Sequence, residues 1–146
     1  LIQRTLIMRR LTLLLAASVV AGCQSPMPAV DPTMAWVDFA MPTPGGKVLM
    51  ADRVDKQRMT DGRFFQVTPG SHELRVRFDF EVFGGGQGMD TDPQERLCYM
   101  TVRYDDFEAG QRYRLEARSL AFTPSARLIN RQGQIVAKER QINCVP

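Results

Sequence analysis

The chain has 146 residues, a formal net charge of +3, one histidine and three cysteines, which fits one ordinary domain and argues against a multidomain enzyme. The excess charge lies in Arg4, Arg9 and Arg10, and removing these three from the 19 basic residues leaves 16 against 16 acidic residues. A chain cut at residue 23 is therefore neutral, which argues against nucleic acid as a partner, since that needs an unbalanced basic surface on the folded part.

An export signal is predicted over residues 1–22. Arg9 and Arg10 form a short cationic segment, and an almost wholly apolar run follows at residues 11–20. This order is typical of a signal peptide. The run, with the two small residues after it, is 12 residues long, well short of the roughly 20 that a transmembrane helix needs. We expect Met8 to be the first translated residue.

The apolar run ends at Val20-Ala21-Gly22-Cys23, an aliphatic residue, two small residues and a cysteine. This motif resembles the lipobox of bacterial lipoproteins. Small side chains let a peptidase hold the chain extended, and the Cys23 thiol is a soft nucleophile that can accept a diacylglyceryl group. The resemblance implies a thioether-linked lipid and an acylated amino terminus at Cys23, and more than one acyl chain suffices for stable anchoring.

The residue after the cysteine is Gln24. By the same resemblance, the absence of Asp at this position implies an anchor in the outer membrane of a two-membrane bacterium, with the protein facing the periplasm. The alternative is an ordinary cleaved signal peptide whose mature end happens to be Cys23.

Residues 23–33 are predicted to be the lipidated cysteine and a tether. Residues 24–33 contain Ser25, Pro26, Pro28 and Pro32 and show no apolar period. A flexible linker of this length has a typical end-to-end distance of about 17 to 19 Å. The remaining residues, 34–146, are predicted to form one periplasmic domain held close to the membrane surface.

The rest of the chain alternates between apolar and polar residues and is interrupted by turn residues. The clearest strand covers residues 72–82, where His72 and the apolar even-numbered residues up to Val82 alternate with charged ones. Such alternation indicates a strand with one face in the core and one in water. The other predicted strands are 35–39, 47–51, 63–67, 98–104, 113–117 and a hairpin of 126–129 with 134–138. About seven short strands predict an all-β fold, a small antiparallel β-sandwich.

The turn into the clearest strand reads Thr68-Pro69-Gly70-Ser71-His72. With the alternating strand that follows, it resembles the core of PEGA-type domains, small β-sandwich modules of bacterial envelope and surface proteins. With the strands before the turn included, the resemblance covers about thirty residues, and the PEGA tetrad itself is absent. It implies a binding or structural module without a catalytic centre.

Two cysteines, Cys98 and Cys144, remain once Cys23 is assigned to the lipid. In an oxidising compartment we expect them to form a disulfide, which would stabilise the fold by roughly 4 kcal/mol in the chain-entropy estimate. The alternative is two buried free thiols.

No catalytic set can be assembled around the single histidine. Ser-His-Asp or Cys-His catalysis would have to use His72, but its place at the first inward position after a turn favours a structural role, with the imidazole capping a loop carbonyl. A structural zinc site needs four cysteine or histidine ligands and a catalytic one about three protein ligands, whereas the chain offers two free cysteines and one histidine. We therefore expect no enzyme activity and no cofactor.

A glycine-rich polar loop is predicted over residues 84–95. Its Asp90, Asp92 and Glu95 have carboxylates that can converge on a hard cation such as calcium, although the other ligands of an EF-hand pattern are missing. A solvated acidic loop is the simpler interpretation. The glycines do not predict a phosphate-binding loop, because the Lys-Ser/Thr ending is absent.

Two further groups of side chains are candidates for a binding surface. Five arginines can line an exposed sheet face for an anionic envelope polymer, although interleaved acidic residues favour a mixed solvated face: Arg75, Arg77, Arg103, Arg114 and Arg118. Trp36 and Phe83 are expected in core or rim packing.

These observations together predict a membrane-anchored envelope lipoprotein that acts as a non-catalytic binding or structural module. Its partners would be the membrane, through the lipid, and an envelope protein or cell-wall component. The alternative function is a lipoprotein inhibitor of a hydrolase, with the loop at 84–95 inserted into an active site.

Overall fold

The computed structural model describes residues 3–8, 22–23, 25–83 and 92–146. The described residues form nine strands, and the all-β fold class predicted from the alternation is confirmed. The strands are β1 (Ala35–Ala40), β2 (Gly46–Val54), β3 (Gln57–Arg58), β4 (Phe65–Val67), β5 (Gly70–Val82), β6 (Gln94–Phe107), β7 (Arg112–Leu120), β8 (Thr123–Ile129) and β9 (Ile135–Cys144).

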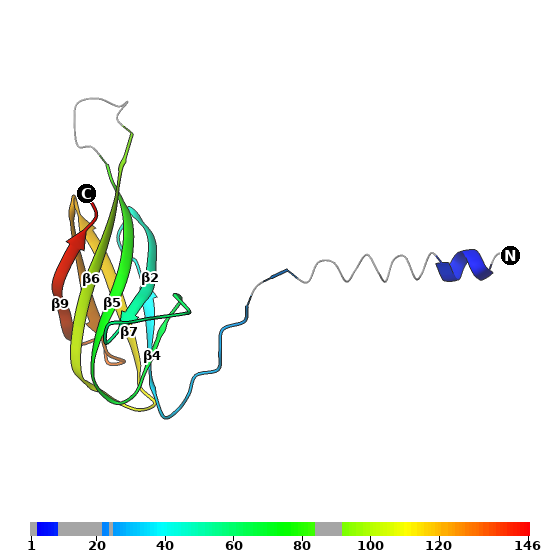
Figure 1. Ribbon diagram of the computed structural model, residues 1–146, viewed down its shortest axis with the longest axis horizontal. Helices are drawn as coiled ribbons and strands as arrows, with labels where there is room; N and C mark the ends of the chain where they lie inside the picture. The colour runs from blue at the N-terminus through cyan, green and yellow to red at the C-terminus, as the bar shows by residue number, and fades with distance from the viewer. Residues whose placement is uncertain (1–2, 9–21, 24, 84–91) are drawn as a thin grey trace.

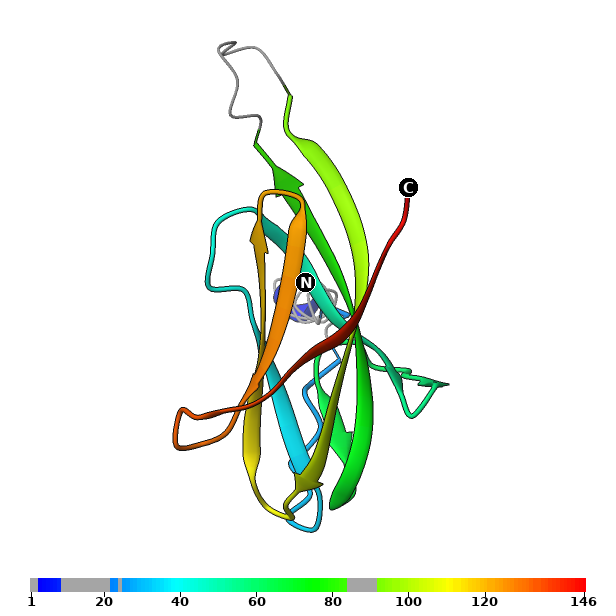
Figure 2. The ribbon, with the colours of Figure 1, turned by 90° about the vertical axis from the view of Figure 1, so that its left-hand side faces the viewer.

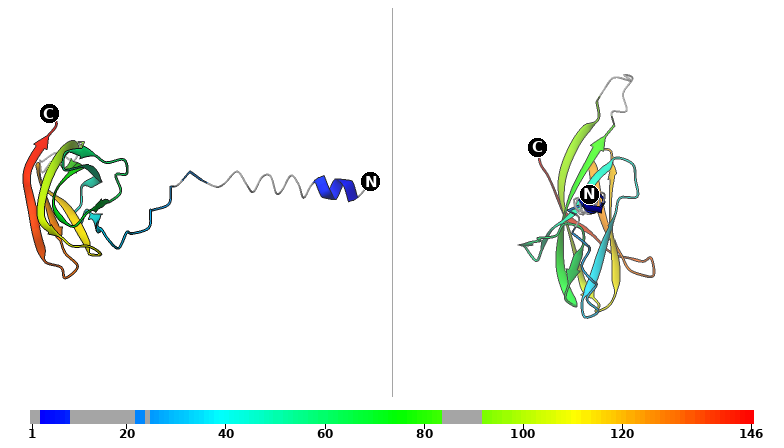
Figure 3. Two further views of the ribbon diagram at one scale, coloured as in Figure 1. Left: turned by 60° about the horizontal axis from the view of Figure 1, so that its bottom comes forward. Right: turned by 90° about the vertical axis from the view of Figure 1, so that its right-hand side faces the viewer.

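The strands follow one continuous pairing order, β3-β2-β5-β6-β9-β8-β7-β1-β4, which doubles back at β9 into two layers (Figures 1 and 2). The first part of β9 pairs with β8 and the second part with β6. We call the layer of β3, β2, β5 and β6 the β5 layer, and the layer of β8, β7, β1 and β4 the β7 layer. The view along the strands in Figure 3 shows the two layers facing each other.

The core lies between the two layers. Every second residue of β5 is buried, from Leu74 to Val82, as are Tyr113, Leu115 and Ala117 of β7. This is the alternation that the sequence predicts. Burial of these apolar faces supplies the main driving force for the fold, at roughly 25 cal/mol for each Å² removed from water.

The pairing of β1 with β7 is parallel, whereas the other strand pairs among the described residues are antiparallel. The sandwich is therefore mixed. Parallel neighbours need a long connection, and here most of the domain separates the two strands in the chain. No local turn fixes their relative direction.

Most strands extend beyond their predicted ranges, whereas β4 is shorter than the predicted strand 63–67. Strand β6 begins at Gln94, so the end of the predicted loop, including Glu95, pairs with β5. It also continues to Phe107, beyond the predicted strand 98–104. Strand β3 was not predicted, because two exposed polar residues have no hydrophobic period.

Candidate functional site

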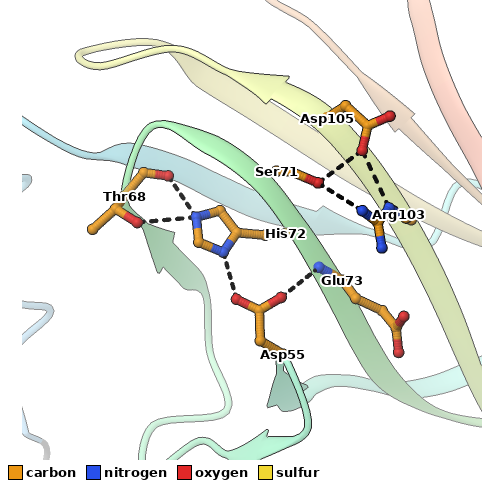
Figure 4. A network of polar contacts seen from close by, with 7 residues as sticks. All are labelled: Asp55, Thr68, Ser71, His72, Glu73, Arg103 and Asp105. Atoms are coloured by element: carbon orange, nitrogen blue, oxygen red, sulfur yellow. Dashed lines mark hydrogen bonds and ion pairs between the residues drawn. The ribbon is translucent and has the colours of Figure 1, made fainter.

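A network of polar contacts surrounds the single histidine where β5 begins (Figure 4). Its side chains come from three places in the fold: the turn between β2 and β3, the turn before β5, and neighbouring positions of β5 and β6. The residues in the network are Asp55, Thr68, Ser71, His72, Glu73, Arg103 and Asp105.

Two turns bring these side chains together. Gly70 has a φ of 110°, a conformation that favours glycine because it lacks a Cβ, and the reversal there places His72 back against Thr68. Asp55 and Lys56 have φ values of 48° and 70°, which form the tight turn between β2 and β3. That turn holds the Asp55 carboxylate beside β5.

The imidazole of His72 bridges the two turns. Its Nδ1 lies 2.6 Å from Oδ2 of Asp55. Its Nε2 lies 2.7 Å from the carbonyl oxygen of Thr68 and 3.0 Å from the hydroxyl oxygen of the same residue. The histidine therefore contacts the loop carbonyl that the sequence predicted it would cap.

This geometry resembles an Asp-His-hydroxyl triad in composition but differs in its hydrogen bonding. A general base needs a ring nitrogen whose lone pair faces the nucleophile. Nε2 of His72 lies closer to the Thr68 carbonyl oxygen than to the Thr68 hydroxyl oxygen, and a carbonyl oxygen is an acceptor only. The arrangement can clasp two turns to β5.

The Asp55 carboxylate is held ionised. Burial raises its pKa, but hydrogen bonds from the Glu73 amide and from His72 outweigh that effect, so the pKa lies below its usual 3.8. The Glu73 amide donates to Oδ1 at 2.9 Å, and the Asp55 amide donates to the Glu73 carbonyl at 2.9 Å. The turn is thereby fixed to β5 by both its backbone and its side chain.

A second group of contacts adjoins the histidine. The hydroxyl of Ser71 donates to Asp105 at 2.7 Å, and Arg103 donates to the same carboxylate at 3.1 Å and to the Ser71 hydroxyl at 3.1 Å. The pKa of Asp105 is lowered, first by the Ser71 hydrogen bond and then by that of Arg103. The Ser71 hydroxyl is thus committed to a carboxylate and does not contact the imidazole.

The carboxylates considered as cation ligands do not form a cluster in the described part of the chain. Asp90 lies outside the described residues, with the glycines at 84–88. Glu95 lies on β6 and accepts a hydrogen bond from Lys47 at 2.6 Å. The pKa of Lys47 is raised, first by its hydrogen bond to Glu81 and then by that to Glu95. No group of three metal-binding side chains occurs in the described parts of the chain, which include Asp92.

The five arginines considered as one face lie on two opposite layers. Arg75, Arg77 and Arg103 lie on β5 and β6, whereas Arg114 and Arg118 lie on β7. The five arginines therefore do not line a single face, because β5 and β7 belong to different layers. Trp36 is 2% exposed and stacks on Phe64 with ring centroids 4.2 Å apart, whereas Phe83 is 62% exposed.

The three cysteines have different environments. Cys98 and Cys144 face each other on β6 and β9 and form the predicted disulfide. Cys23 is free and exposed, and residues 25–33, which contain no helix or strand, lead from its vicinity to β1 (Figure 1). Val20 and Ala21 of the lipobox-like motif lie outside the described residues, as does the apolar run before them.

In the described part of the chain, no helix is both long enough and apolar enough to cross a membrane. Comparison with protein-family models, with curated proteins and with solved structures finds no match.

The sequence pointed to His72 but not to its partners. Asp55 lies 17 residues earlier in the chain, in a turn with no motif that marks it. The buried Glu116 was likewise missed as a structural centre, because on an alternating strand it occupies an outward position. The feature of the sequence that could have indicated this role is that Glu116 lies two residues from Arg114 on one side and two residues from Arg118 on the other.

Proposed function

We propose that this protein is a lipid-anchored envelope lipoprotein whose β-sandwich acts as a non-catalytic binding or structural module. The anchor is a lipid on Cys23, placed in the outer membrane so that the sandwich faces the periplasm. The observation that carries the proposal is the state of the cysteines: the two in the sandwich pair with each other, and Cys23 is exposed at the end of a lipobox-like motif.

The disulfide supports the proposed compartment. Disulfides persist in oxidising environments such as the bacterial periplasm and are rare in reducing ones. The bond joins facing residues of adjacent strands, so it belongs to the folded domain. Export through a signal peptide would deliver the chain to such a compartment.

The geometry around His72 supports a non-catalytic role. The imidazole contacts Asp55 and the Thr68 carbonyl, and the nearby Ser71 hydroxyl donates to Asp105. These contacts join turns to strands. The turn of Pro69 and Gly70 into β5 supports the proposed likeness to PEGA-type modules, which are binding or structural units.

The anchor is tested by labelling cells with an alkyne palmitate while they express the full chain. We expect the wild type to be labelled and to enter the detergent phase of a detergent–water partition. Cys23→Ser should lose both properties. The double variant Cys98→Ser, Cys144→Ser is the matched control, because it removes thiols but keeps Cys23, and it should still be labelled.

An unlabelled wild-type protein, or equal labelling of Cys23→Ser, would overturn the proposed anchor. Separation of inner and outer membranes on a density gradient then tests the sorting implied by Gln24. Recovery of the labelled protein in the inner membrane would contradict an outer-membrane location.

A further inference from the structure

The outer faces of the two layers differ in how their arginines are neutralised. On the β5 layer, Arg77 contacts Asp79 at 3.0 Å and Arg103 contacts Asp105 at 3.1 Å. Asp52 is contacted by Arg75 at 3.2 Å and by Arg53 at 3.8 Å. On the β7 layer three arginines share one carboxylate, that of Glu116. Cationic charge is therefore in local excess on the β7 layer.

Glu116 is the centre of this cluster, which we call the Glu116 cluster and define as Arg114, Glu116, Arg118 and Arg127. Arg114 contacts one carboxylate oxygen at 2.9 Å. Arg127 contacts the other at 3.0 Å and Arg118 contacts it at 3.3 Å. The Glu116 side chain is 7% exposed, whereas the three arginine side chains are 31 to 54% exposed.

The strand pairing explains why these side chains meet. Residues 114, 116 and 118 share one face of β7 because successive residues of a strand point to opposite sides. Arg127 lies directly opposite Glu116 on β8, and Lys138 lies opposite Arg127 on β9. Four cations thus lie across three neighbouring strands, around one nearly buried carboxylate.

A hollow of about 250 Å³ lies beside the Glu116 cluster. Its lining includes Glu116, Arg118, Arg127, Lys138 and Glu139. Glu139 accepts a hydrogen bond from the Ala126 amide at 3.1 Å. The lining therefore has three cations and two carboxylates. Arg114 contacts Glu116 from outside the lining, and with it the group has four cations and two carboxylates.

We propose that this hollow binds a phosphate group. Each guanidinium has five N–H donors in a planar fork that fits phosphate oxygens, and Glu116 engages few of them. The local excess of two positive charges matches the charge of about −1.5 to −2 on a phosphate monoester near neutral pH.

The buried carboxylate fixes the arginines in place before any ligand arrives. Burial raises the pKa of Glu116, but hydrogen bonds from Arg127 and Arg118 and the charge of Arg114 outweigh this, so the pKa is lowered and the group stays ionised. Fixed guanidinium groups lose less conformational entropy on binding than free ones. The proposal does not depend on the lipid anchor.

The test uses the full chain carrying Cys23→Ser, so that no lipid interferes. Inorganic phosphate is titrated at constant ionic strength while NMR follows the arginine side-chain N–H signals. We expect the signals of the Glu116 cluster to shift and saturate. Arg118→Gln should weaken binding about tenfold or more, because a charge-assisted hydrogen bond contributes about 1.5–3 kcal/mol.

Arg77→Gln is the matched control. Arg77 and Arg118 are both 39% exposed, each contacts a carboxylate, and the two substitutions remove the same charge from opposite layers. Phosphate affinity should be unchanged in Arg77→Gln. Equal weakening in both variants would overturn the proposal, because it would show a response to net charge alone. Thermal melting confirms that both variants fold.

A second arm distinguishes a soluble phosphate from a lipid headgroup. The same proteins are mixed with phosphatidylcholine vesicles that contain or lack phosphatidic acid, whose headgroup is a phosphate monoester. Binding that needs phosphatidic acid and is lost in Arg118→Gln supports a lipid source, whereas saturable binding of inorganic phosphate alone supports a soluble one. Failure of both probes to bind would overturn the site.

Discussion

Asp55 and His72 contact each other between two turns, and the contribution of the Asp55 carboxylate to stability should depend on pH. The pKa of Asp55 is lowered in the folded protein. Its contribution to stability is therefore complete above the usual pKa of 3.8 and is lost as the pH falls through the lower folded value. The loss begins only in acid, so the Asp55 carboxylate stays ionised throughout the neutral range.

Asp55→Asn should lower the free energy of unfolding near pH 7 by about 1 kcal/mol, because a half-exposed carboxylate is screened by water. The difference from the wild type should shrink toward pH 2. Urea unfolding at a series of pH values measures it. Asp106→Asn, at an exposed position of β6, is the control and should leave the pH dependence unchanged. A constant deficit at all pH values would contradict the role of the charge.

The turn between β7 and β8 carries an alanine in a conformation that favours glycine. Ala121 has a φ of 50°, and left-handed backbone costs an L-residue roughly 1 kcal/mol. Ala121→Gly should raise the free energy of unfolding by about 0.5 kcal/mol, since the gain is partly offset by the flexibility of glycine in the unfolded chain. Denaturant unfolding measures the change.

Gly133→Ala is the reciprocal control in the turn between β8 and β9. Its φ is 81°, and a Cβ there would meet no atom within 4 Å. The substitution should therefore be destabilising by about 1 kcal/mol through backbone strain alone. A stabilised Gly133→Ala protein would show that turn strain is not the deciding effect at these two positions.

At the scale of elements, β9 decides how the two layers are joined. Its first part pairs with β8 and its second part with β6, and the disulfide fastens that second part to β6 at Cys98. Residues 139–143 are mostly exposed on this strand. They bury little apolar surface, so the disulfide is a major part of what holds them.

Replacing both Cys98 and Cys144 by Ser should lower the free energy of unfolding by about 2–4 kcal/mol. The effect should be concentrated in β9. Hydrogen exchange of residues 139–144 should accelerate more than that of the central residues of β5, which are buried in the core. Equal acceleration in both strands would contradict a local role for the bond.

At the scale of the whole molecule, the tether contacts the sandwich through exposed polar groups. Residues 25–30 are exposed and contain no helix or strand, and Arg63 donates to the carbonyl oxygens of Ser25 at 2.9 Å and Pro26 at 3.5 Å. Closer to β1, the Asp31 amide donates to the Gln66 side chain at 3.2 Å. Such exposed hydrogen bonds add little stability. The sandwich should therefore fold without the segment that precedes it.

Limited digestion with elastase should cut after Ala29 or Val30 and release a resistant fragment that begins near residue 31. Its melting temperature should equal that of the undigested protein, because the removed segment buries no core residue. Mass spectrometry locates the cut, and calorimetry compares the two melts. A clearly lower melting temperature would show that the tether packs on the domain.

Much of this architecture follows from local sequence patterns. The alternation along β5, β6 and β7 predicted the buried faces, because a strand places successive side chains on opposite sides. Turn residues such as Pro69 and Gly70 predicted where β5 begins. Two cysteines left over once Cys23 is assigned to the proposed lipid predicted the disulfide.

The sequence by itself determined where most of the strands lie, which faces are buried and which cysteines pair, because these depend on neighbours in the chain or on chemistry that few residues share. The tertiary structure decided the parallel pairing of β1 with β7, the partner of His72 and the sharing of Glu116 by three arginines. These features join segments far apart in the chain. Their geometry follows from how the two layers pack, and no local pattern encodes it.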